Sequence, residues 1–389
     1  MKVLYLKWDA FGSSYMLNEW KKAGHECFIY DFPQKSEDTR RSEELATKVA
    51  RLIIDNKIDV VFSFNYFPTV AIACKACRVR YVSWTYDSPY IQLYSKTIEY
   101  DTNYAFVFDK AEYNNLKKLG VETVYYLPMC APVDVYDSMQ LTVDRKKQYE
   151  TDIAMIGSMY TEKKHHLFRY LENLDDYSLG FIDGIIEAQK SIYGLDIIEQ
   201  SLTPDIINNM QKECPLIASG DGLETIEWVF SKYFLSRRLT AIERKELIEE
   251  LAKKHKVSIY TPELTPDLKV DNRGVVDYYK EAPYAIKSAK LNLNITLRSI
   301  VSGMPLRIFD IMGCGGFLLT NYQEDFLEFF EPNQDFVYFE SKQDMVEKAE
   351  YYLKNDDIRE KIALSGYNKI KKHHTYGHRM NEILKIISK

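Results

Sequence analysis

The 389-residue chain has little cysteine, little net charge and no long apolar run. Its six cysteines are too few for the disulfide framework of a small secreted domain. The longest uncharged stretch of the C-terminal half, Ile311–Gln323, is far shorter than the roughly 20 apolar residues that a membrane-spanning helix needs. Met1-Lys2 leads straight into a short apolar run, without the pattern of a signal peptide. We therefore expect a reduced, cytoplasmic protein without a transmembrane segment.

Several binding and catalytic classes lack their signatures in this chain. The 51 basic and 57 acidic side chains leave a formal net charge of −6, which is too mild for a nucleic-acid groove, so we expect no nucleic-acid partner. No Gly-x-Ser-x-Gly, His-Glu-x-x-His or P-loop sequence occurs. Cys74 and Cys77 have CxxC spacing, but no second pair lies near them, and we interpret both as structural. We expect no metal site.

The first 130 residues alternate β-rich runs with helical patterns. The predicted strands are Val3–Leu6, Cys27–Tyr30, Val60–Phe64, Tyr81–Trp84, Ala105–Phe108 and Thr123–Leu127. The predicted helices between them are Tyr15–Lys22, Glu43–Asn56, Val70–Cys77 and Lys110–Leu119. Repeated β–α units of this size predict a parallel sheet covered by helices on both faces. We expect a Rossmann-like domain over residues 1–145.

A second series of β–α units begins with the buried run Asp152–Gly157. The further predicted strands are Val257–Tyr260, Leu291–Ile295, Phe317–Thr320 and Phe336–Phe339. The predicted helices lie near residues 163–174, 305–312, 324–330, 342–354, 358–374 and 379–388, and residues 180–255 form a largely helical insertion. We therefore predict an α/β protein with two Rossmann-like domains, 1–145 and 146–375, followed by a C-terminal helix within residues 376–389.

The loop after the strand 152–157 is the first candidate binding site, because open α/β sheets bind ligands beyond the carboxyl ends of their strands. Gly157 and Ser158 end the strand, and Lys163 follows at the start of the predicted helix. Glycine lets the backbone approach a ligand, and a helix N-terminus with a lysine favours phosphate. The sequence is equally compatible with a plain turn followed by solvated lysines.

The segment after the strand 291–295 is the second candidate. Pro305 is predicted to open a helix, so that the amides near Gly303 would face a ligand. Arg307 lies in the first turn, where a cation is unfavourable unless an anion neutralises it. Asp310 lies one turn further on, either as a surface partner of Arg307 or as a carboxylate that accepts hydrogen bonds from ribose hydroxyls.

Aromatic and carboxylate side chains follow two strands of the first domain. Trp8 and Asp9, with Gly12 close behind, follow the first strand, and Trp84, Tyr86 and Asp87 end the fourth. Aromatic rings stack on the apolar faces of sugars while carboxylates accept hydroxyl protons, so we consider these residues candidates for saccharide binding. In the alternative interpretation each Asp only forms a turn, for which Asp-Ser-Pro is typical.

The segment Arg307-x-Phe-Asp-x-x-Gly-Cys-Gly-x-x-x-Leu319 resembles the Arg-x-Phe-Glu-x-x-Ala-Cys-Gly-x-x-x-Leu stretch of GT-B glycosyltransferases, and more closely the CgeB-like group, named for a spore-maturation protein. The closing helix 356–374 and the run Trp84–Pro89 fit the same group. The resemblance implies two Rossmann-like domains that face each other across a cleft. It also implies an acceptor on the N-terminal domain, a nucleotide-sugar on the C-terminal one, and a last helix that crosses back to the first domain.

The resemblance assigns donor-binding roles residue by residue. Asp310 takes the position of the ribose-binding glutamate, and Tyr260 ends the strand that meets the base. Arg307 and the amides from Gly303 onward lie near the phosphates. Gly157 and Ser158 lie beneath the diphosphate. Ser302 departs from the pattern, because related retaining enzymes have a glutamate there. Arg298 could replace it as a diphosphate clamp, since a guanidinium matches phosphate geometry.

We interpret the chain as a metal-independent glycosyltransferase that moves a sugar from a nucleotide-diphosphate donor to a hydroxyl group. The favoured donor is a UDP-sugar, and the acceptor is a saccharide, a lipid-linked molecule or a protein. It would need no cofactor beyond this co-substrate. Asp87 is the candidate catalytic base if the reaction inverts configuration. Two alternatives stay open: a sugar-nucleotide epimerase of the same architecture, and a non-catalytic nucleotide-sugar-binding protein.

Overall fold

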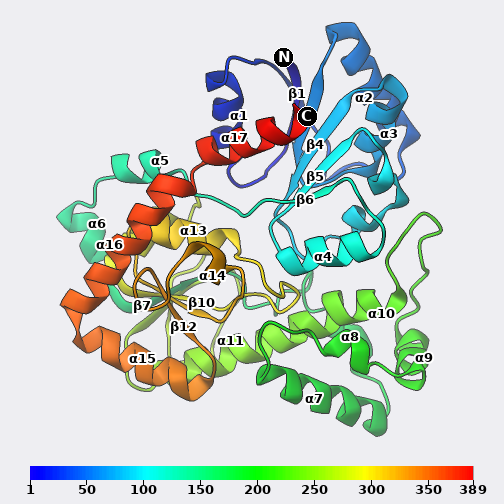
Figure 1. The fold of residues 1–389 in the computed structure, drawn as a ribbon. Helices are drawn as coiled ribbons and strands as arrows, with labels where there is room; N and C mark the ends of the chain where they lie inside the picture. The colour runs from blue at the N-terminus through cyan, green and yellow to red at the C-terminus, as the bar shows by residue number, and fades with distance from the viewer. Residues whose placement is uncertain (389) are drawn as a thin grey trace. The chain divides into compact units, whose positions relative to one another are not determined.

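The chain folds into two compact units in the computed structural model, which describes residues 1–388 (Figure 1). Unit 1 contains residues 1–132, 218–224 and the segment from His374 onward, and unit 2 contains residues 133–217 and 225–373. The first boundary lies at Pro132 rather than at 145, because residues 133–149 form two helices of unit 2, α5 (Val133–Ser138) and α6 (Val143–Tyr149). The chain therefore passes between the two units more than once.

Unit 1 is built on a six-stranded parallel sheet in the order β2-β1-β3-β4-β5-β6. The strands are β1 (Lys2–Lys7), β2 (Glu26–Asp31), β3 (Val60–Phe64), β4 (Arg80–Thr85), β5 (Asn103–Val107) and β6 (Val124–Tyr126). The helices are α1 (Ser13–Lys22), α2 (Glu43–Asn56), α3 (Pro68–Cys77), the 3-10 turns η1 (Ile91–Tyr94) and η2 (Lys96–Glu99), α4 (Lys110–Lys118) and α17 (Tyr376–Ile387). β3 is buried at every position, as expected for a parallel strand covered on both faces.

Unit 2 contains a second parallel sheet, in the order β12-β11-β10-β7-β8-β9. The strands are β7 (Thr151–Ile156), β8 (Val257–Tyr260), β9 (Asp271–Asn272), β10 (Ala289–Asn294), β11 (Leu318–Asn321) and β12 (Val337–Phe339). The helices that follow β8 are α12 (Ala282–Ser288), α13 (Leu306–Gly313), α14 (Phe326–Phe329), α15 (Lys342–Lys354) and α16 (Asp356–His373). The core of this sheet packs Ile153, Leu293 and Leu319 against side chains such as Met345 and Ile362.

A helical insertion separates β7 from β8. It contains the 3-10 turn η3 (Leu167–Leu171), α7 (Asp176–Lys190), α8 (Ile198–Ser201), α9 (Pro204–Glu213), α10 (Ile226–Val229), a π-helical turn (Phe230–Leu235) and α11 (Ser236–Ala252). The insertion has its own apolar core, in which Phe168, Ile182 and Phe234 are buried. The expected helical insertion is thus present, and α11 also contributes Leu247 and Ile248 to the sheet core.

The last helix, α17, belongs to unit 1 and lies beside α1 (Figure 1). Arg379 fixes it, because this buried side chain donates Nε to the Pro128 carbonyl at 2.7 Å and Nη2 to the Met129 carbonyl at 3.0 Å. The His374 carbonyl accepts the Ala131 N–H at 3.0 Å. The C-terminal segment therefore completes the N-terminal unit.

The two parallel sheets confirm the predicted α/β class, and each predicted strand is present. The helix predicted near residues 163–174 is wrong: residues 161–166 are irregular and only η3 follows. All six cysteines are free thiols, and burial raises the pKa of Cys74 well above its usual range. None of the helices within residues 1–388 combines the length and hydropathy that crossing a bilayer requires.

Gly12 is predicted to be essential for docking α17. Its φ is +78°, and a Cβ built on it would lie 1.9 Å from the hydroxyl of the buried Tyr376. Gly24 has a φ of +79° but open space around it, so Gly24→Ala reports the backbone cost alone. We expect Gly12→Ala to lower the free energy of unfolding by about 1–3 kcal/mol more than Gly24→Ala, measured by urea denaturation. Equal losses would contradict the role of Tyr376.

Candidate functional site

The strand order of unit 2 reverses between β7 and β10, which pair directly. From β7 the sheet continues to β8, and from β10 it continues to β11. Ligands of open α/β sheets bind outside the carboxyl ends of the strands at such a switch point. Gly157 follows β7 and Ile295 follows β10, so the loops that begin at these two residues form the candidate binding edge of unit 2.

Gly157 has a backbone conformation that side chains rarely adopt, with φ +152°. Its N–H donates to the Tyr260 carbonyl at 3.1 Å, and a Cβ at this position would lie 3.4 Å from Nη1 of Arg244. No helix begins directly after this loop, and Lys163 is exposed on the irregular segment that follows. The helix N-terminus expected at this loop is therefore absent.

Ser158 joins two glutamates that the sequence analysis did not single out. Its Oγ lies 2.8 Å from Oε2 of Glu162 and 3.2 Å from Oε1 of Glu263, and Oε1 of Glu263 also accepts the Met159 N–H at 2.9 Å. Burial and the adjacent Glu263 raise the pKa of Glu162 to about 7. Burial also opposes ionisation of Glu263, but hydrogen bonds from Glu162 and Thr261 outweigh it and lower the pKa of Glu263. The pair therefore holds one proton near neutral pH.

Arg244 on α11 lies against the same loop. Its Nε donates to the Ile295 carbonyl at 3.1 Å, and its Nη1 and Nη2 donate to the carbonyls of Ser158 and Ile295. The guanidinium carbon lies 4.8 Å from the centre of the Tyr160 ring. Arg244 therefore ties together the two chain segments that leave the switch point.

Arg298 does not serve as the expected diphosphate clamp. Its Nε lies 2.7 Å and its Nη2 2.8 Å from the carboxylate of Glu243. Its remaining N–H groups donate to the carbonyls of Ile192, Gln189 and Lys190, and its guanidinium carbon lies 3.9 Å from the centre of the Tyr193 ring. The side chains of Arg298 and Glu243 are only 7% and 5% exposed. These internal partners give Arg298 a structural role within unit 2.

Asp310 and Arg307 lie on α13 one turn apart. Oδ1 of the buried Asp310 accepts hydrogen bonds from the hydroxyls of Tyr136 at 2.7 Å and Tyr278 at 2.9 Å. Oδ2 lies 3.7 Å from Nη1 of Arg307, and neither of these two buried atoms has a hydrogen-bond partner among the described residues. Burial raises the pKa of Asp310, although Arg307 and the two tyrosines oppose the shift. Asp310 thus retains one oxygen for a further donor.

Two other predicted donor residues lie on this edge. Gly303 is buried, and its carbonyl accepts a hydrogen bond from Nε2 of Gln323 at 3.0 Å, which fixes the loop before α13. Tyr260 ends β8, and its hydroxyl accepts a hydrogen bond from Nη1 of Arg273 at 3.1 Å. Burial raises the pKa of Tyr260. Pro305 precedes α13 rather than forming its first residue.

Unit 1 has its own switch point between β1 and β3. Trp8 stacks on Tyr86 with ring centres 6.3 Å apart, and its indole N–H donates to the Phe64 carbonyl at 3.0 Å. Nδ2 of the buried Asn65 donates to Oδ2 of the exposed Asp87 at 2.6 Å, while its Oδ1 accepts the Tyr86 N–H at 3.2 Å. The fold therefore brings Trp8, Tyr86 and Asp87 together, and Asn65 orients the carboxylate.

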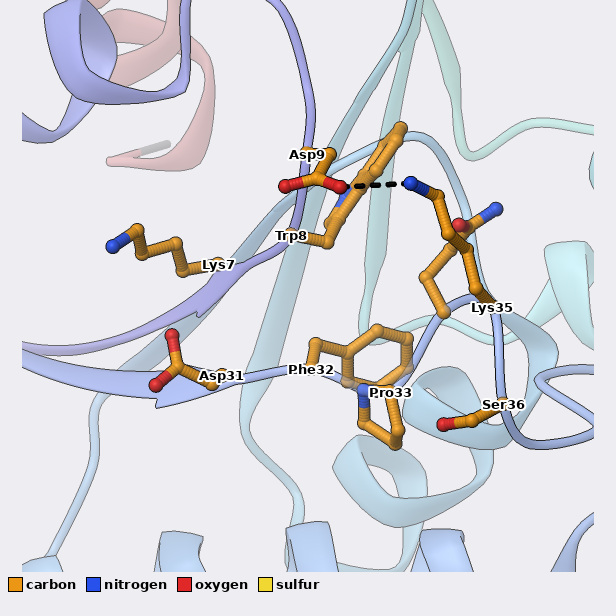
Figure 2. Close-up of a pocket in the computed structure, with 9 residues that line it drawn as sticks. Lys7, Trp8, Asp9, Asp31, Phe32, Pro33, Lys35 and Ser36 are labelled. Atoms are coloured by element: carbon orange, nitrogen blue, oxygen red, sulfur yellow. Dashed lines mark hydrogen bonds and ion pairs between the residues drawn. The ribbon is translucent and has the colours of Figure 1, made fainter.

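Asp9 faces a pocket of about 340 Å³ at the ends of β1 and β2 (Figure 2). The pocket is lined by two segments, residues 7–9 and 31–36. Asp9 forms an ion pair with Lys35 at 2.7 Å, in which both side chains are largely exposed. The hydrogen bond from Lys35 lowers the pKa of Asp9. Such an exposed pair contributes little to stability, so a ligand could displace it.

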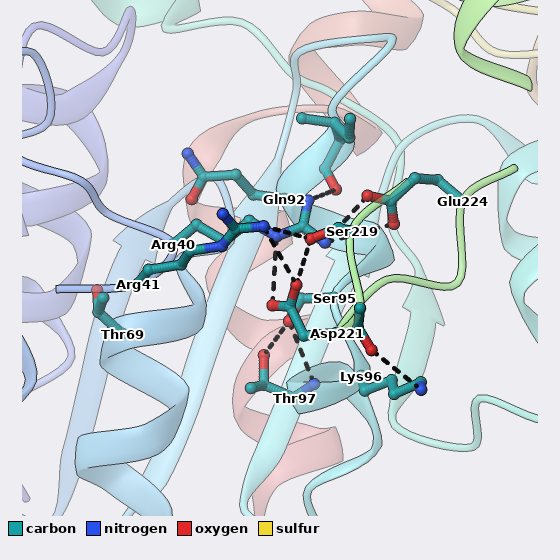
Figure 3. Close-up of polar contacts among 12 residues, drawn as sticks. Arg40, Arg41, Thr69, Gln92, Ser95, Lys96, Thr97, Ser219, Asp221 and Glu224 are labelled. Carbon is teal, nitrogen blue, oxygen red and sulfur yellow. Dashed lines mark hydrogen bonds and ion pairs between the residues drawn. The ribbon is translucent and has the colours of Figure 1, made fainter. Parts of the chain in front are cut away.

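Residues 218–224 of the insertion bind the same edge of unit 1 (Figure 3). Gly222 forms an antiparallel bridge with Ser95, and the Lys96 N–H donates to the Asp221 carbonyl at 2.7 Å. Arg40, in the loop before α2, lies 3.0 Å from Glu224 and 3.4 Å from Asp221. This segment was expected to be part of the second domain, and its ion pairs with Arg40 explain why it belongs to unit 1.

Trp84 and Gly12 do not line a sugar site. Trp84 is completely buried, donates its indole N–H to the Leu127 carbonyl at 3.3 Å and stacks on Phe64. Gly12 lies beneath Tyr376 of α17. Their sequence positions at strand ends suggested ligand contact, but the C-terminal helix and the sheet core occupy the space around both residues.

Known proteins share this architecture. The structure of HepE from Anabaena in complex with UDP-glucose matches with a TM-score of 0.58, at 10% identity over 100% of this chain and 99% of that chain. The fold is GT-B. Sucrose-phosphate synthase from Thermosynechococcus elongatus matches with a TM-score of 0.55, at 9% identity over 100% and 99% of the two chains. A glycosyltransferase from Rickettsia africae matches with a TM-score of 0.54, at 10% identity over 99% and 97%.

Comparison by sequence matches a smaller part of this chain than comparison by structure does. A family model described as glycosyl transferase-like matches residues 237–385, which begin in α11 and end in α17. No curated protein sequence matches the chain. The matched segment contains Arg244, Glu263 and Asp310.

The sequence analysis missed Arg244, Glu162 and Glu263. The sequence around Arg244 and Glu263 does not mark either residue as part of a site. Arg244 is one of many charged residues in its helix, and Glu263 lies in an irregular loop. Glu162 lies beside the predicted Lys163, and only the position of Glu263 in space reveals that it belongs to a pair. Within residues 1–388, no three His, Cys, Asp or Glu side chains are placed to hold a metal ion.

The raised pKa of Glu162 predicts a specific pH dependence of stability. A folded-state pKa of about 7 lies above the ordinary 4.5, so the folded protein keeps this proton longer than the unfolded chain and loses the associated stability as the pH rises from 4.5 to 7. Glu162→Gln removes this dependence, whereas Glu249→Gln, at an exposed position of α11, retains it. Urea denaturation across this pH range should show wild type losing stability relative to Glu162→Gln. Parallel curves would contradict the shared proton.

Proposed function

We propose that the chain is a glycosyltransferase that moves a sugar from a nucleotide-diphosphate donor to a hydroxyl acceptor. The observation that carries this proposal is the presence of two switch points with different chemistry. The edge of unit 2 combines Gly157 with arginine side chains, which suits an anionic diphosphate. The edge of unit 1 combines stacked aromatic rings with an oriented carboxylate, which suits a neutral hydroxyl compound. Transfer needs two substrates, whereas epimerisation needs one.

The similar GT-B structures favour a UDP-sugar as the donor, because HepE was crystallised with UDP and with UDP-glucose. The motif from Arg307 to Leu319 favours the CgeB-like group. We propose unit 2 as the donor site, with Gly157, Ser158 and Gly303 near the phosphates and Tyr260 near the base. Asp310 would accept a ribose hydroxyl at Oδ2, which has no hydrogen-bond donor among residues 1–388.

Unit 1 is the proposed acceptor site, for a saccharide, lipid-linked or protein hydroxyl. Trp8 and Tyr86 would contact the acceptor, and Asp9 lies at the mouth of the neighbouring pocket. Asp87 is the proposed base, because its carboxylate is exposed and Asn65 holds one of its oxygens at 2.6 Å. A carboxylate held in this way can take a proton from an acceptor hydroxyl. Arginine and lysine side chains would stabilise the departing diphosphate without a metal or another cofactor.

A thermal-shift screen tests the donor proposal directly. UDP, GDP and dTDP are compared with the corresponding nucleosides, in the presence and absence of EDTA. We expect at least one diphosphate to raise the melting temperature in a dose-dependent way and EDTA to leave the shift unchanged. If none of the three diphosphates stabilises the protein, the transferase proposal fails. Loss of the shift in EDTA would show that a metal ion is needed.

Asp87→Asn tests the proposed base. The amide keeps the size of the side chain but cannot take a proton, so we expect transfer to fall by roughly 100- to 10,000-fold while donor binding is retained. Asp101→Asn is the control, because Asp101 is an exposed unit 1 aspartate that forms an ion pair with Lys75 at 2.8 Å. Transfer is measured by release of the free diphosphate in the presence of acceptor. Wild-type turnover in Asp87→Asn would leave Asp87 as a turn-forming residue, and an epimer formed from donor alone would favour the epimerase.

A further inference from the structure

Arg244 is a buried cation without an anionic side chain as partner. Its side chain is in the core of unit 2, with the residue only 8% exposed. Its hydrogen bonds go to two backbone carbonyls, those of Ser158 and Ile295, and no carboxylate of residues 1–388 forms an ion pair with it. Burial lowers its pKa, which means that the surroundings oppose the charge. Charged groups in protein interiors are normally paired.

The neighbouring arginine of unit 2 shows what a completed pair looks like. Arg298 binds both carboxylate oxygens of Glu243, the residue directly before Arg244, and uses its other N–H groups on carbonyls. Arg244 uses three of the five N–H donors that a guanidinium carries, so two have no acceptor among residues 1–388. Helix α11 thus carries Glu243, which forms an ion pair with Arg298, and Arg244, which forms no ion pair within residues 1–388.

The position of Arg244 points to an anion at the switch point. Its Nη1 lies 3.4 Å from where a Cβ of Gly157 would be, so any larger residue at 157 would fill the space beside the guanidinium. Arg307 lies close enough for its charge to act on Arg244. Two cations near each other repel unless an anion compensates them, and a phosphate group accepts two N–H bonds from one guanidinium.

We propose that Arg244 binds the diphosphate of the nucleotide donor and supplies the positive charge that the sequence suggested for Arg298. This inference rests on the proposed function, because it takes the donor site to be the edge of unit 2. The bonds of Arg244 to the carbonyls of Ser158 and Ile295 hold its guanidinium in place before the donor arrives, and its place on the 17-residue helix α11 makes the site rigid.

The competing explanation is that Arg244 only ties the two loops together. Glu162 and Glu263 act on it electrostatically and could balance its charge without a ligand. In that case a substitution of Arg244 would disturb the whole site and weaken nucleoside and nucleotide binding by the same factor. A role in phosphate binding weakens only the ligand that carries phosphates.

The experiment compares UDP with uridine on the full-length chain. Dissociation constants are measured for wild type, Arg244→Gln and Arg244→Lys by calorimetry for UDP and by ligand-observed NMR for uridine. Lys245→Gln is the matched control, because Lys245 is the next residue of α11 and is exposed. We expect Arg244→Gln to weaken UDP roughly 10- to 100-fold with uridine unchanged, Arg244→Lys to recover part of the loss, and Lys245→Gln to bind both like wild type.

The outcomes separate the two proposals. Failure of wild type to bind UDP, GDP or dTDP would overturn the proposed function, and the Arg244 role with it. Normal UDP binding by wild type together with unchanged UDP affinity in Arg244→Gln, or equal losses for UDP and uridine, would overturn the Arg244 role alone. Near-ultraviolet circular dichroism checks the fold of each variant. If Arg244→Gln does not fold, the ratio of the UDP and uridine losses in Arg244→Lys decides the same question.

Discussion

Arg244 holds together the two chain segments that leave the centre of the second sheet. Parallel pairing of β7 with β10 places their carboxyl ends side by side, and the carbonyls of Ser158 and Ile295, just beyond these ends, both accept hydrogen bonds from Arg244. The guanidinium of this one side chain of α11 donates hydrogen bonds to both carbonyls. One of these segments also contains Gly157, whose N–H donates to the Tyr260 carbonyl, and Ser158, whose hydroxyl contacts two glutamates.

Arg298, Arg379 and Arg244 all have largely buried guanidinium groups, and each has a different structural role. Arg298 is neutralised by Glu243 and closes the insertion against the sheet of unit 2. Arg379 binds the carbonyls at the end of the N-terminal segment and so fastens α17 to unit 1. Arg244 has carbonyl partners but no carboxylate partner within the described part of the chain. Burial alone therefore does not reveal the role of an arginine, because the role depends on whether its charge is already compensated.

The strands were predictable because parallel strands are buried on both faces and appear as short apolar runs, such as Val60–Phe64 and Thr151–Ile156. The sequence also predicted that Gly157 lies at the end of a strand. The irregular path of residues 161–166 was not predictable, because contacts such as that between Ser158 and Glu162 hold this segment rather than helical hydrogen bonds. β9, with two residues, is too short to leave a pattern.

Site residues were harder to predict than strands, because partners distant in sequence decide what each side chain does. Trp84 is the penultimate residue of β4 and Trp8 directly follows β1, yet the Leu127 carbonyl and Tyr376 enclose Trp84 whereas Trp8 remains at the edge. Arg298 lies at the switch point, but Glu243 occupies its guanidinium. Asn65 orients Asp87 through a hydrogen bond and has a left-handed backbone conformation, with φ +56°. The local sequence did not predict this conformation.

The central claim is that the diphosphate of the donor binds at the β7–β10 switch point of unit 2. A crystal structure of the wild-type chain with UDP tests it most directly. We expect phosphate oxygens within hydrogen-bond distance of the Arg244 guanidinium and of the backbone at Gly157 and Ser158. Diphosphate density at the edge of unit 1, or on unit 2 away from Gly157 and Arg244, would contradict it.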